Sequence, residues 1–370
     1  MQFKMNDIVS ADMCEIFSNL KDKIRAFEGR VVLITGGAGF LGYNFIHFLI
    51  YGNAKIFRLS CRIIVLDNFI RGLPSWLKEM EAGGLIKLIK ADITKFDYKC
   101  LEDKPDFIIH AASIASPIFY RKYPIETMDA NVIGLRAILD YSLDRIKEGS
   151  SLKSVLFFSS SEIYGDPQKD FIPTPEDYRG YVSCTGPRAC YDESKRYGET
   201  LCVNFSKTYG VPVKIVRPFN NYGPGLNLED RRVIPDFCRN VLNGENIVLL
   251  SDGRPSRTFC YITDAITGYL LLLLSDQNGE PFNIGTDYQE ISMAELAKLI
   301  VKISRNAFGT KALEVIYEQS DDKNYLIDNP QRRCPLIKKA RQVLNYQPAI
   351  ELQEGLKRTL LWYKSQKQGE

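Results

Sequence analysis

Tyr191 and Lys195 have the residue types and spacing that could remove a proton from an alcohol. Because they are four positions apart, they share one face of a helix. A tyrosine has an unperturbed pKa of roughly 10 and is a poor base, but a lysine cation and a cationic nicotinamide nearby would favour the phenolate. Ser160, in the serine run after a predicted strand at 155–158, could hold the reacting oxygen. These three residues predict alcohol oxidation with hydride transfer to NAD.

The tyrosine–lysine spacing is not specific by itself. It also occurs at Tyr51 and Lys55 and at Tyr363 and Lys367, which we expect to be surface pairs. Only the pair at Tyr191 begins a predicted helix downstream of a strand that ends in serines. A solvated helix face is the alternative interpretation.

Charged residues elsewhere could contact a substrate. Glu162 lies just past the same strand end, where a carboxyl group could act as an acid or a base. A solvent-facing loop acid is the alternative. Arg257 and Arg333 are candidates for binding a diphosphate, because guanidinium groups bind phosphate oxygens in bidentate pairs. Exposed arginines are usually only solvated, and this alternative stays open for both.

A glycine-rich turn near the N-terminus predicts a dinucleotide site. It follows the apolar residues 31–34 and precedes an apolar helical pattern. Glycine lets the backbone approach a pyrophosphate, and a helix N-terminus offers free N–H groups and a positive dipole end. The spacing is G-x-x-G-x-x-G, and an ordinary strand–helix turn is the alternative. The cofactor residues expected here are Gly36, Gly39, Phe40, Leu41 and Gly42.

Asp67 ends a second predicted strand, 61–67, and is placed to accept hydrogen bonds from an adenosine ribose. The insert 52–60 accounts for a distance from the glycines longer than the usual roughly 20 residues. A carboxylate repels a 2′-phosphate, so NAD is favoured over NADP, although Arg71 opposes this preference. A turn residue is the alternative role for Asp67. Further cofactor contacts are expected at Asn68, Asp92, Ile93 and Ala111, which follow strand ends.

The composition limits the class of protein. The 370 residues are 45% hydrophobic with a net charge of +3, which gives no case for nucleic acid or an acidic membrane as partner. Nine scattered cysteines indicate reduced thiols in a cytoplasmic protein. With two histidines, a histidine metal site is not expected. No segment approaches the roughly 18 apolar residues of a membrane span.

The order of predicted elements indicates an α/β fold. Strands and helices alternate over 30–217, which predicts a doubly wound parallel sheet, a Rossmann domain that binds NAD. After Pro218 the pattern breaks, and 218–370 is expected to form a smaller mixed α/β lobe that binds the substrate. Residues 258–275 are expected to return to the first domain. Residues 1–29 are expected to form an amphipathic helical extension that packs on the body or on a second subunit.

Two further runs carry a resemblance to a known family. They are Ser160–Pro167, with the letters SSEIYGDP, and Gly186–Glu193, with the letters GPRACYDE. With the glycine turn and the Tyr191 pair, the chain resembles the extended short-chain dehydrogenase/reductase (NAD-dependent epimerase/dehydratase) family over about 30–365. Within it, the chain is most similar to the UDP-glucuronate decarboxylase (UDP-xylose synthase) family.

The resemblance implies a complete reaction and a substrate. NAD stays bound while Tyr191 assists oxidation of the sugar at C4, the resulting β-keto acid loses its carboxylate, and hydride return gives UDP-xylose. It also implies a homodimer that acts on a nucleotide sugar, and it assigns site roles. Ser160, Ser161 and Glu162 would contact the sugar, Arg257 the sugar and diphosphate, and Asn220 and Arg333 the diphosphate.

Departures from the family pattern leave alternatives open. The family usually has threonine at Ser160 and glycine at Ser194, and 227–235 also reads differently. A 4,6-dehydratase is the nearest rival, but that family has an Asp-Glu pair where this chain has Ser161-Glu162. A 4-epimerase usually lacks the glutamate. A non-catalytic NAD-sensing protein is a rival of a different class.

Overall fold

A computed structural model describes residues 4–311, 313–320 and 327–367 of the chain. Its centre is a seven-stranded sheet in which every pairing is parallel. The predicted doubly wound α/β fold is therefore confirmed. The strands, in their order across the sheet, are β11 (Pro281–Ile284), β6 (Val213–Pro218), β5 (Ser154–Phe158), β4 (Phe107–His110), β1 (Val31–Thr35), β2 (Arg62–Asp67) and β3 (Lys87–Lys90).

The order of the strands reverses beside β1. This strand pairs with β2 on one side and with β4 on the other, so a crevice opens between their carboxyl ends. Ligands of open parallel sheets bind at such a switch point. The fold thus places the glycine turn after β1, Asp67 at the end of β2 and Ala111 after β4 around one crevice.

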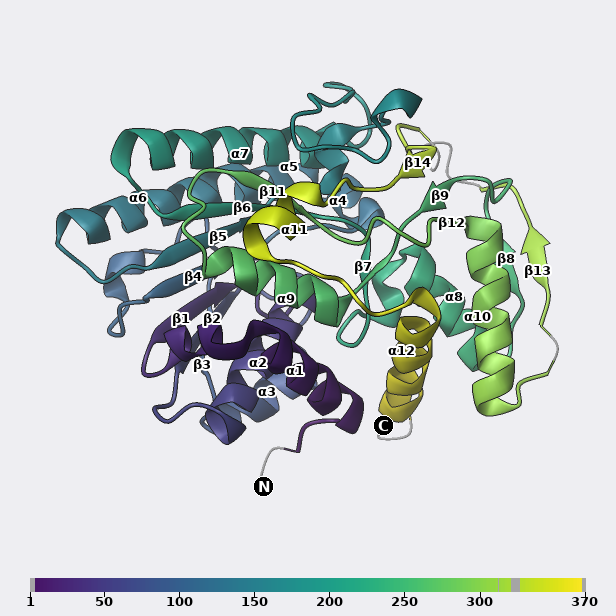
Figure 1. Ribbon diagram of the computed structural model, residues 1–370, viewed down its shortest axis with the longest axis horizontal. Helices are drawn as coiled ribbons and strands as arrows, with labels where there is room; N and C mark the ends of the chain where they lie inside the picture. The colour runs from purple at the N-terminus through teal and green to yellow at the C-terminus, as the bar shows by residue number, and fades with distance from the viewer. Residues whose placement is uncertain (1–3, 312, 321–326, 368–370) are drawn as a thin grey trace.

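Helices cover both faces of the sheet (Figure 1). Val32 and Ile34 of β1 pack in the apolar cluster that contains α2 and α9, whereas Val31 and Leu33 pack in the cluster that contains α6 and α7. Alternate residues of a strand point to opposite faces, so both faces of a fully buried strand must be apolar. The helices concerned are α2 (Phe40–Lys55), α3 (Ser75–Ala82), α6 (Leu135–Lys147), α7 (Ala189–Tyr209) and α9 (Ile262–Leu273).

The last helical segment between β4 and β5 is divided in the structure. It consists of α5 (Pro124–Asp129), a π-helical turn (Ala130–Gly134) and then α6. A Cβ added at Gly134 would lie 2.5 Å from Cδ1 of Ile93, so this glycine allows the helix to pass close to the end of the sheet. The helix predicted over 191–209 is α7, which begins two residues earlier.

The N-terminal extension is helical, as predicted, and packs on the body. Helix α1 (Asp7–Leu20) lies against α9 and α2 (Figure 1). Asp12 on its inner face is buried, and its carboxylate accepts a hydrogen bond of 2.8 Å from Tyr261 and one of 3.0 Å from Arg358. The extension is thereby tied to α12 (Leu352–Lys367).

Segments after residue 217 are shared between the large sheet and a smaller lobe. The expected return of 258–275 corresponds to α9, but β11 also joins the sheet, which the sequence analysis did not anticipate. The smaller lobe contains two small sheets, β12-β9-β14 and β13-β8. Elements outside the large sheet are α4 (Pro117–Lys122), β7 (Asn221–Tyr222), α8 (Val233–Asn243), β8 (Ile247–Leu249), β9 (Ser256–Arg257), β10 (Cys260–Tyr261), β12 (Ile291–Ser292), α10 (Met293–Phe308), β13 (Val315–Tyr317), β14 (Arg332–Arg333) and α11 (Lys338–Leu344).

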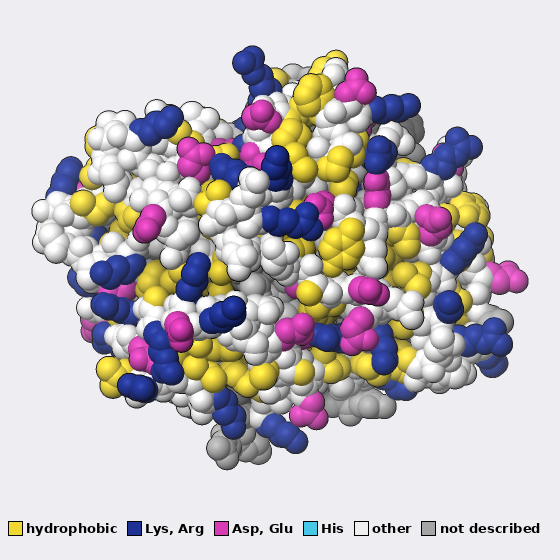
Figure 2. Space-filling view, viewed as in Figure 1, with side chains coloured by type: hydrophobic (Ala, Val, Ile, Leu, Met, Phe, Trp, Pro, Cys, Tyr) yellow, Lys and Arg dark blue, Asp and Glu magenta, His cyan; other side chains and the backbone are white. Residues whose placement is uncertain are grey.

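The molecular surface carries intermixed charges. On the face shown in Figure 2, Lys and Arg side chains are interspersed with Asp and Glu side chains. Within the described ranges, none of the helices is long and apolar enough to cross a membrane. The same residues contain no cluster of three or more His, Cys, Asp or Glu side chains arranged to hold a metal ion.

Candidate active site

A cleft of about 1660 Å³ runs along the carboxyl ends of the central strands. Its walls come from both halves of the molecule, because segments after β1, β2, β4 and β5 face residues of the smaller lobe. Nearly all the residues singled out in the sequence line this one cleft, as do Pro218 and the segment Gly225–Phe237.

The glycine turn forms a tight backbone cradle at one end of the cleft. Gly36 has a φ of +74°, and a Cβ there would lie 2.5 Å from Cα of Ala112. A Cβ on Gly42 would lie 2.4 Å from the carbonyl oxygen of Gly37. Gly36 and Gly39 line the cleft with Phe40 and Leu41, whereas Gly42 lies behind the turn and allows α2 to pack against it. Only glycine fits at Gly36 and Gly42, as a dinucleotide-binding turn requires.

Asp67 supports this turn as well as facing the cleft. Its carboxylate accepts hydrogen bonds of 3.0 Å from the Ala38 amide and 2.7 Å from the Phe69 amide. Burial raises the pKa of Asp67, and these backbone bonds oppose the rise. Asn68 also lines the cleft, and its side chain accepts a bond of 3.0 Å from the Ile70 amide. The turn role and the ribose role are therefore compatible for both residues.

Arg71 contacts other residues of the cleft wall. Its guanidinium lies 3.1 Å from the carboxylate of Asp230 and 4.1 Å from the centre of the Phe119 ring. The positive charge of Arg71, which opposed the expected preference for NAD, is thus paired with Asp230.

The other predicted cofactor residues also line the cleft. Ala111 continues β4 and donates its amide to the carbonyl of Thr35 at 3.0 Å. Asp92 accepts two hydrogen bonds from Thr94, of 2.9 Å to the amide and 2.8 Å to the hydroxyl, while Ile93 lies beside the glycine of the π-helical turn. An extended dinucleotide fits the glycine turn, the acidic residue at the end of β2 and the residues after β3 and β4. The residues that would hold it are those around Gly36, Asp67 and Ala111.

Tyr191, Lys195 and Ser160 lie together where the cleft reaches the end of β5. Lys195 donates a hydrogen bond of 2.8 Å to the carbonyl of Phe158, and its Nζ lies 5.6 Å from the centre of the Tyr191 ring. Ser160 hydrogen-bonds to Tyr191, and its hydroxyl accepts a bond of 3.1 Å from the Glu162 amide. Helix α7 begins directly before Tyr191, so one rigid turn positions the phenol.

The electrostatics of this trio differ from the expectation. Burial raises the pKa of Tyr191 to about 12, and the hydrogen bond from Ser160 only partly opposes it. Burial also lowers the pKa of Lys195 to about 7, which reduces its cationic form near neutral pH. In the protein alone, burial therefore outweighs the effect that we expected from the lysine charge. A phenolate here needs a further positive charge, which a bound oxidised nicotinamide would supply.

The two other tyrosine–lysine pairs are not alike. Tyr363, expected at the surface, is buried and donates a hydrogen bond of 2.6 Å to the carbonyl of Leu226. The expectation was wrong because the last helix buries one face against the smaller lobe. Lys367 is exposed and contacts Asn243. Tyr51 is partly buried beside Phe17.

Glu162 is held between two arginines. It forms short ion pairs with Arg188 at the start of α7 and with Arg333 on β14. Burial alone would raise the pKa of Glu162, but the two guanidinium charges outweigh it and hold the pKa at about 2. The side chain is therefore a permanent carboxylate, which is suited to holding cations and poorly suited to donating a proton.

The remaining predicted substrate residues surround this ion cluster. Arg257 is buried and donates to the carbonyls of Pro330 at 2.5 Å and Gln331 at 3.2 Å. Asn220 donates its side-chain amide to the carbonyl of Thr258 at 2.8 Å and lines the cleft. Ser161 is buried next to Glu162 and also lines the cleft.

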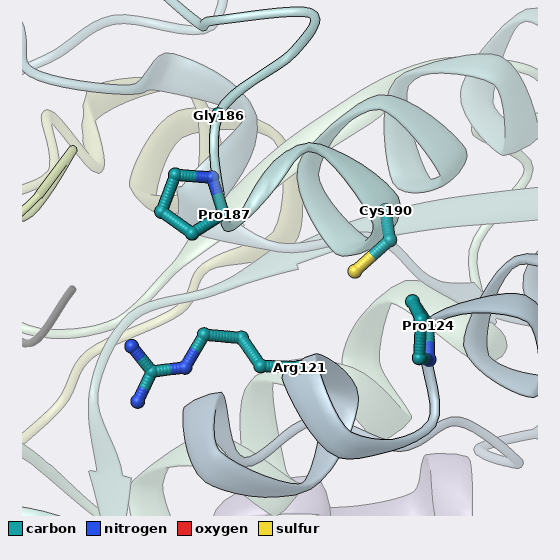
Figure 3. A pocket seen from close by; sticks show the side chains of 5 residues that line it. All are labelled: Arg121, Pro124, Gly186, Pro187 and Cys190. Atoms are coloured by element: carbon teal, nitrogen blue, oxygen red, sulfur yellow. The ribbon is translucent and has the colours of Figure 1, made fainter. Parts of the chain in front are cut away.

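A smaller cavity of about 310 Å³ lies beside the start of α7. Figure 3 shows Gly186 and Pro187 leading into the helix, with the sulfur of Cys190 turned toward the cavity. Arg121 lines both this cavity and the main cleft. The turn before α7 is thus bordered by a cavity on its outer side.

Sequence reasoning missed three residues of the site. Arg188 precedes Tyr191 by three positions, and this proximity was a usable signal. Tyr120 stacks on Tyr191 with ring centres 5.1 Å apart and planes 12° apart, and Arg232 lies close enough for its charge to lower the pKa of Tyr191. Both reach the site through the tertiary fold, and no local pattern marks them.

Comparison with known proteins identifies the relatives of this chain. Residues 32–285 match the NAD dependent epimerase/dehydratase family. UDP-glucuronic acid decarboxylase 5 from Arabidopsis thaliana is 35% identical over 325 residues, which cover 88% of this chain and 86% of that protein.

Two solved structures have the same fold. A UDP-glucose 4-epimerase from Thermotoga maritima, solved with UDP-glucose, aligns with a TM-score of 0.75 at 26% identity and covers 91% of this chain and 99% of its own. A dTDP-glucose 4,6-dehydratase from Streptomyces venezuelae, solved with NAD, aligns with a TM-score of 0.73 at 25% identity and covers 92% and 98%.

Proposed function

Because this chain belongs to the NAD dependent epimerase/dehydratase family, we propose that it converts UDP-glucuronate to UDP-xylose and carbon dioxide. The observation that carries the proposal is the ion cluster beside Tyr191, in which Glu162 stays ionised between Arg188 and Arg333. A cleft end with excess positive charge suits a substrate that carries a diphosphate and a carboxylate.

The residues around Tyr191 perform the proton steps. Ser160 orients the C4 hydroxyl, and Tyr191 takes its proton from the oxygen at C4. A bound NAD, held by the residues around Gly36 and Asp67, would supply the hydride acceptor for C4 and the hydride that restores it. Lys195 is fixed by its hydrogen bond to the carbonyl of Phe158, and its protonated form contributes a positive charge near Tyr191. Tyr120 stacks on the phenol ring and keeps water from its face.

Oxidation at C4 makes the carboxylate a leaving group. The bond between C5 and the carboxyl carbon breaks, its electron pair passes to the C4 carbonyl as an enolate, and carbon dioxide departs. Protonation at C5 and reduction at C4 then give the pentose. Glu162 cannot serve as the proton donor near neutral pH, so its role is to hold the two arginines.

The 4,6-dehydratase is the alternative that the fold equally accommodates. Loss of the C6 hydroxyl needs an acid, and Ser161 stands where an aspartate would supply one. With Glu162 ionised, neither neighbour provides the proton. These two residues favour decarboxylation over dehydration.

Product analysis tests the proposal. We expect incubation with UDP-glucuronate to yield carbon dioxide and a UDP-pentose with no net NADH, measured by chromatography and mass spectrometry. UDP-galacturonate as the only product would indicate an epimerase. Water loss from UDP-glucose, with UDP-glucuronate unreactive, would indicate a dehydratase and contradict the proposal.

A homodimer is part of the same proposal. Apolar side chains are exposed on α5 and the turn after it, namely Ile125 at 63%, Met128 at 43% and Ile133 at 48%. A two-fold axis beside α5 would bury these residues in a self-complementary contact. Light scattering coupled to size exclusion should give twice the chain mass, and Ile125→Lys should reduce it. A monomeric mass for the wild-type protein would contradict this part.

We also propose that the protein works in the cytoplasm. All nine cysteines are free, and five of them are buried. A reducing compartment keeps such thiols intact. Fractionation of cells with an antibody against the chain should place it with cytoplasmic markers, and recovery in a secreted or luminal fraction would contradict this assignment.

A further inference from the structure

Arg188 has two contacts that the proposed reaction does not yet use. It occupies the position before α7, three residues ahead of Tyr191, and lines the same cleft. Its terminal Nη2 pairs with Glu162, while its Nε is buried and has no hydrogen-bond partner among the described residues. The carboxylate of Asp192 lies 3.7 Å from Nε, beyond hydrogen-bond distance. One N–H of a buried guanidinium is therefore left to a ligand.

The cluster holds more positive charge than its partners balance. Arg188 and Arg333 share the carboxylate of Glu162, and Arg257 bonds to neutral carbonyl oxygens. The second acid beside Arg188 is Asp192, and burial raises its pKa to about 7, so it balances only part of the remaining charge. Nε of Arg333 is also buried without a hydrogen-bond partner in the described part of the chain. Buried cations with too few counter-charges are costly, so the arrangement is suited to an anion that completes it.

The three arginines approach the cleft from two directions. Arg257 and Arg333 are directly paired residues on β9 and β14 of the smaller lobe. Arg188 instead belongs to the turn that carries Tyr191. The pair on the smaller lobe suits the diphosphate, and Arg188 is the cation nearest in the chain to the residue that acts at C4. On a hexuronate, the carboxylate is attached to C5, the carbon next to C4.

We infer that Arg188 determines specificity for the sugar carboxylate, and that Glu162 occupies its place on Arg188 until the substrate binds. This inference rests on the proposed decarboxylation. In the complex, the sugar carboxylate takes one side of the Arg188 fork, and Glu162 keeps Arg333. When the bond from C5 to the carboxyl carbon breaks, its electron pair becomes the enolate at C4 and carbon dioxide leaves uncharged. Glu162 then regains Arg188, and the neutral pentose is no longer held there.

Sharing of Arg188 between two carboxylates also affects the rate. A cation that binds the substrate carboxylate tightly stabilises the ground state and opposes its loss as neutral carbon dioxide. Competition from Glu162 weakens the binding of the substrate carboxylate to Arg188. We therefore expect Glu162→Gln to bind UDP-glucuronate more tightly than wild type while turning it over more slowly.

Three nucleotide sugars that differ only at C5 test the inference. UDP-glucuronate has a carboxylate there, UDP-glucose a hydroxymethyl group and UDP-xylose a hydrogen. Their affinities are measured by calorimetry on the NAD-loaded protein in a Tyr191→Phe background, which prevents turnover. Arg188→Gln should weaken UDP-glucuronate binding about tenfold or more, because a charge-assisted pair is lost. Binding of UDP-xylose should change by less than about twofold.

Two further variants control for charge and folding. Arg62→Gln removes an exposed arginine at the opposite end of β2 and should leave all three affinities unchanged. Arg188→Lys keeps the charge but not the planar fork, and should retain part of the preference for UDP-glucuronate. This second variant also provides the test if Arg188→Gln does not fold.

The outcomes separate the inference from the proposed function. Equal weakening of all three ligands by Arg188→Gln, or no weakening of UDP-glucuronate, would overturn the inference. If wild-type protein still releases carbon dioxide from UDP-glucuronate in that case, the proposed function stands. If the wild-type protein neither binds UDP-glucuronate more tightly than the other two sugars nor decarboxylates it, the proposed function itself is contradicted.

Discussion

The two ends of the cleft are built from different kinds of groups. At the cofactor end, glycines and backbone amides from one strand–turn–helix segment make the cradle, and a Cβ on Gly36 would lie only 2.5 Å from the Cα of Ala112. At the substrate end, Glu162, Arg188, Arg257 and Arg333 come from distant parts of the chain and meet as charges. The shape of the backbone therefore suits the ligand at the cofactor end, and the charge of the side chains suits it at the substrate end.

The largest expected effect lies where the two ends meet. Tyr191→Phe should lower kcat by roughly 10²–10⁴-fold, because the proton acceptor is lost. NAD content after purification should stay near one per chain. Tyr197→Phe, on the exposed side of the same helix, is the matched control and should leave kcat unchanged. A Tyr191→Phe enzyme with near-normal turnover would remove the phenol from the mechanism.

The cofactor end should respond to volume. Gly36→Ala should destabilise the protein by about 3 kcal/mol and abolish NAD retention, since it adds a clash to an unfavourable φ. Gly149 has nearly the same φ, +73°, but nothing within 4 Å of an added Cβ. Gly149→Ala should therefore cost only about 1 kcal/mol. Urea unfolding and cofactor absorbance measure both quantities, and equal losses in the two variants would refute the steric account.

The substrate end should respond to pH. The pKa of Glu162 is lowered to about 2, so its stabilising effect is complete above its usual pKa and is lost as pH falls toward 2. Wild type should exceed Glu162→Gln in stability by roughly 2 kcal/mol at pH 5, below the raised pKa of Asp192. Urea unfolding at several pH values should show the difference shrinking only below about pH 4.5. A difference that is absent at pH 5, or that persists unchanged at pH 3, would contradict the ion-pair account.

The smallest effect concerns cofactor choice at Asp67. Asp67→Asn keeps an acceptor for one supporting amide but removes the charge that repels a 2′-phosphate. The preference for NAD over NADP should fall by about tenfold, as measured by calorimetry. Tighter binding of NADP than NAD to the wild-type protein would exclude the ribose role of Asp67.

The contrast between the two ends also explains what the sequence could predict. The glycine turn, Asp67 and the Tyr191 pair are local patterns next to strand ends, and the fold brings them to one crevice as expected. Arg188, Tyr120 and Arg232 were missed, because their contacts depend on tertiary packing. Strand β11 was missed because four residues at the edge of a sheet have little pattern of their own. Tyr363 was assigned to the surface because its burial against the smaller lobe depends on tertiary packing, which no local pattern marks.

Glu162 shows the same limit for electrostatics. Its position after β5 correctly suggested a place in the cleft, but its protonation depends on two arginines that are 26 and 171 residues away in the chain. The low pKa of this carboxyl group argues against the acid role that was one of its two predicted roles, because the group stays ionised near neutral pH. Charge state in this site is a property of the assembled cluster.

The central claim is that Tyr191 and NAD oxidise C4 and then restore it within one binding event. UDP-glucuronate deuterated at C4 tests this claim when it is incubated with the enzyme in ordinary water. We predict UDP-xylose that retains the deuterium at C4, because the same cofactor takes the hydride and returns it. Loss of the label at C4 during conversion to UDP-xylose, measured by mass spectrometry and NMR, would contradict the closed cycle.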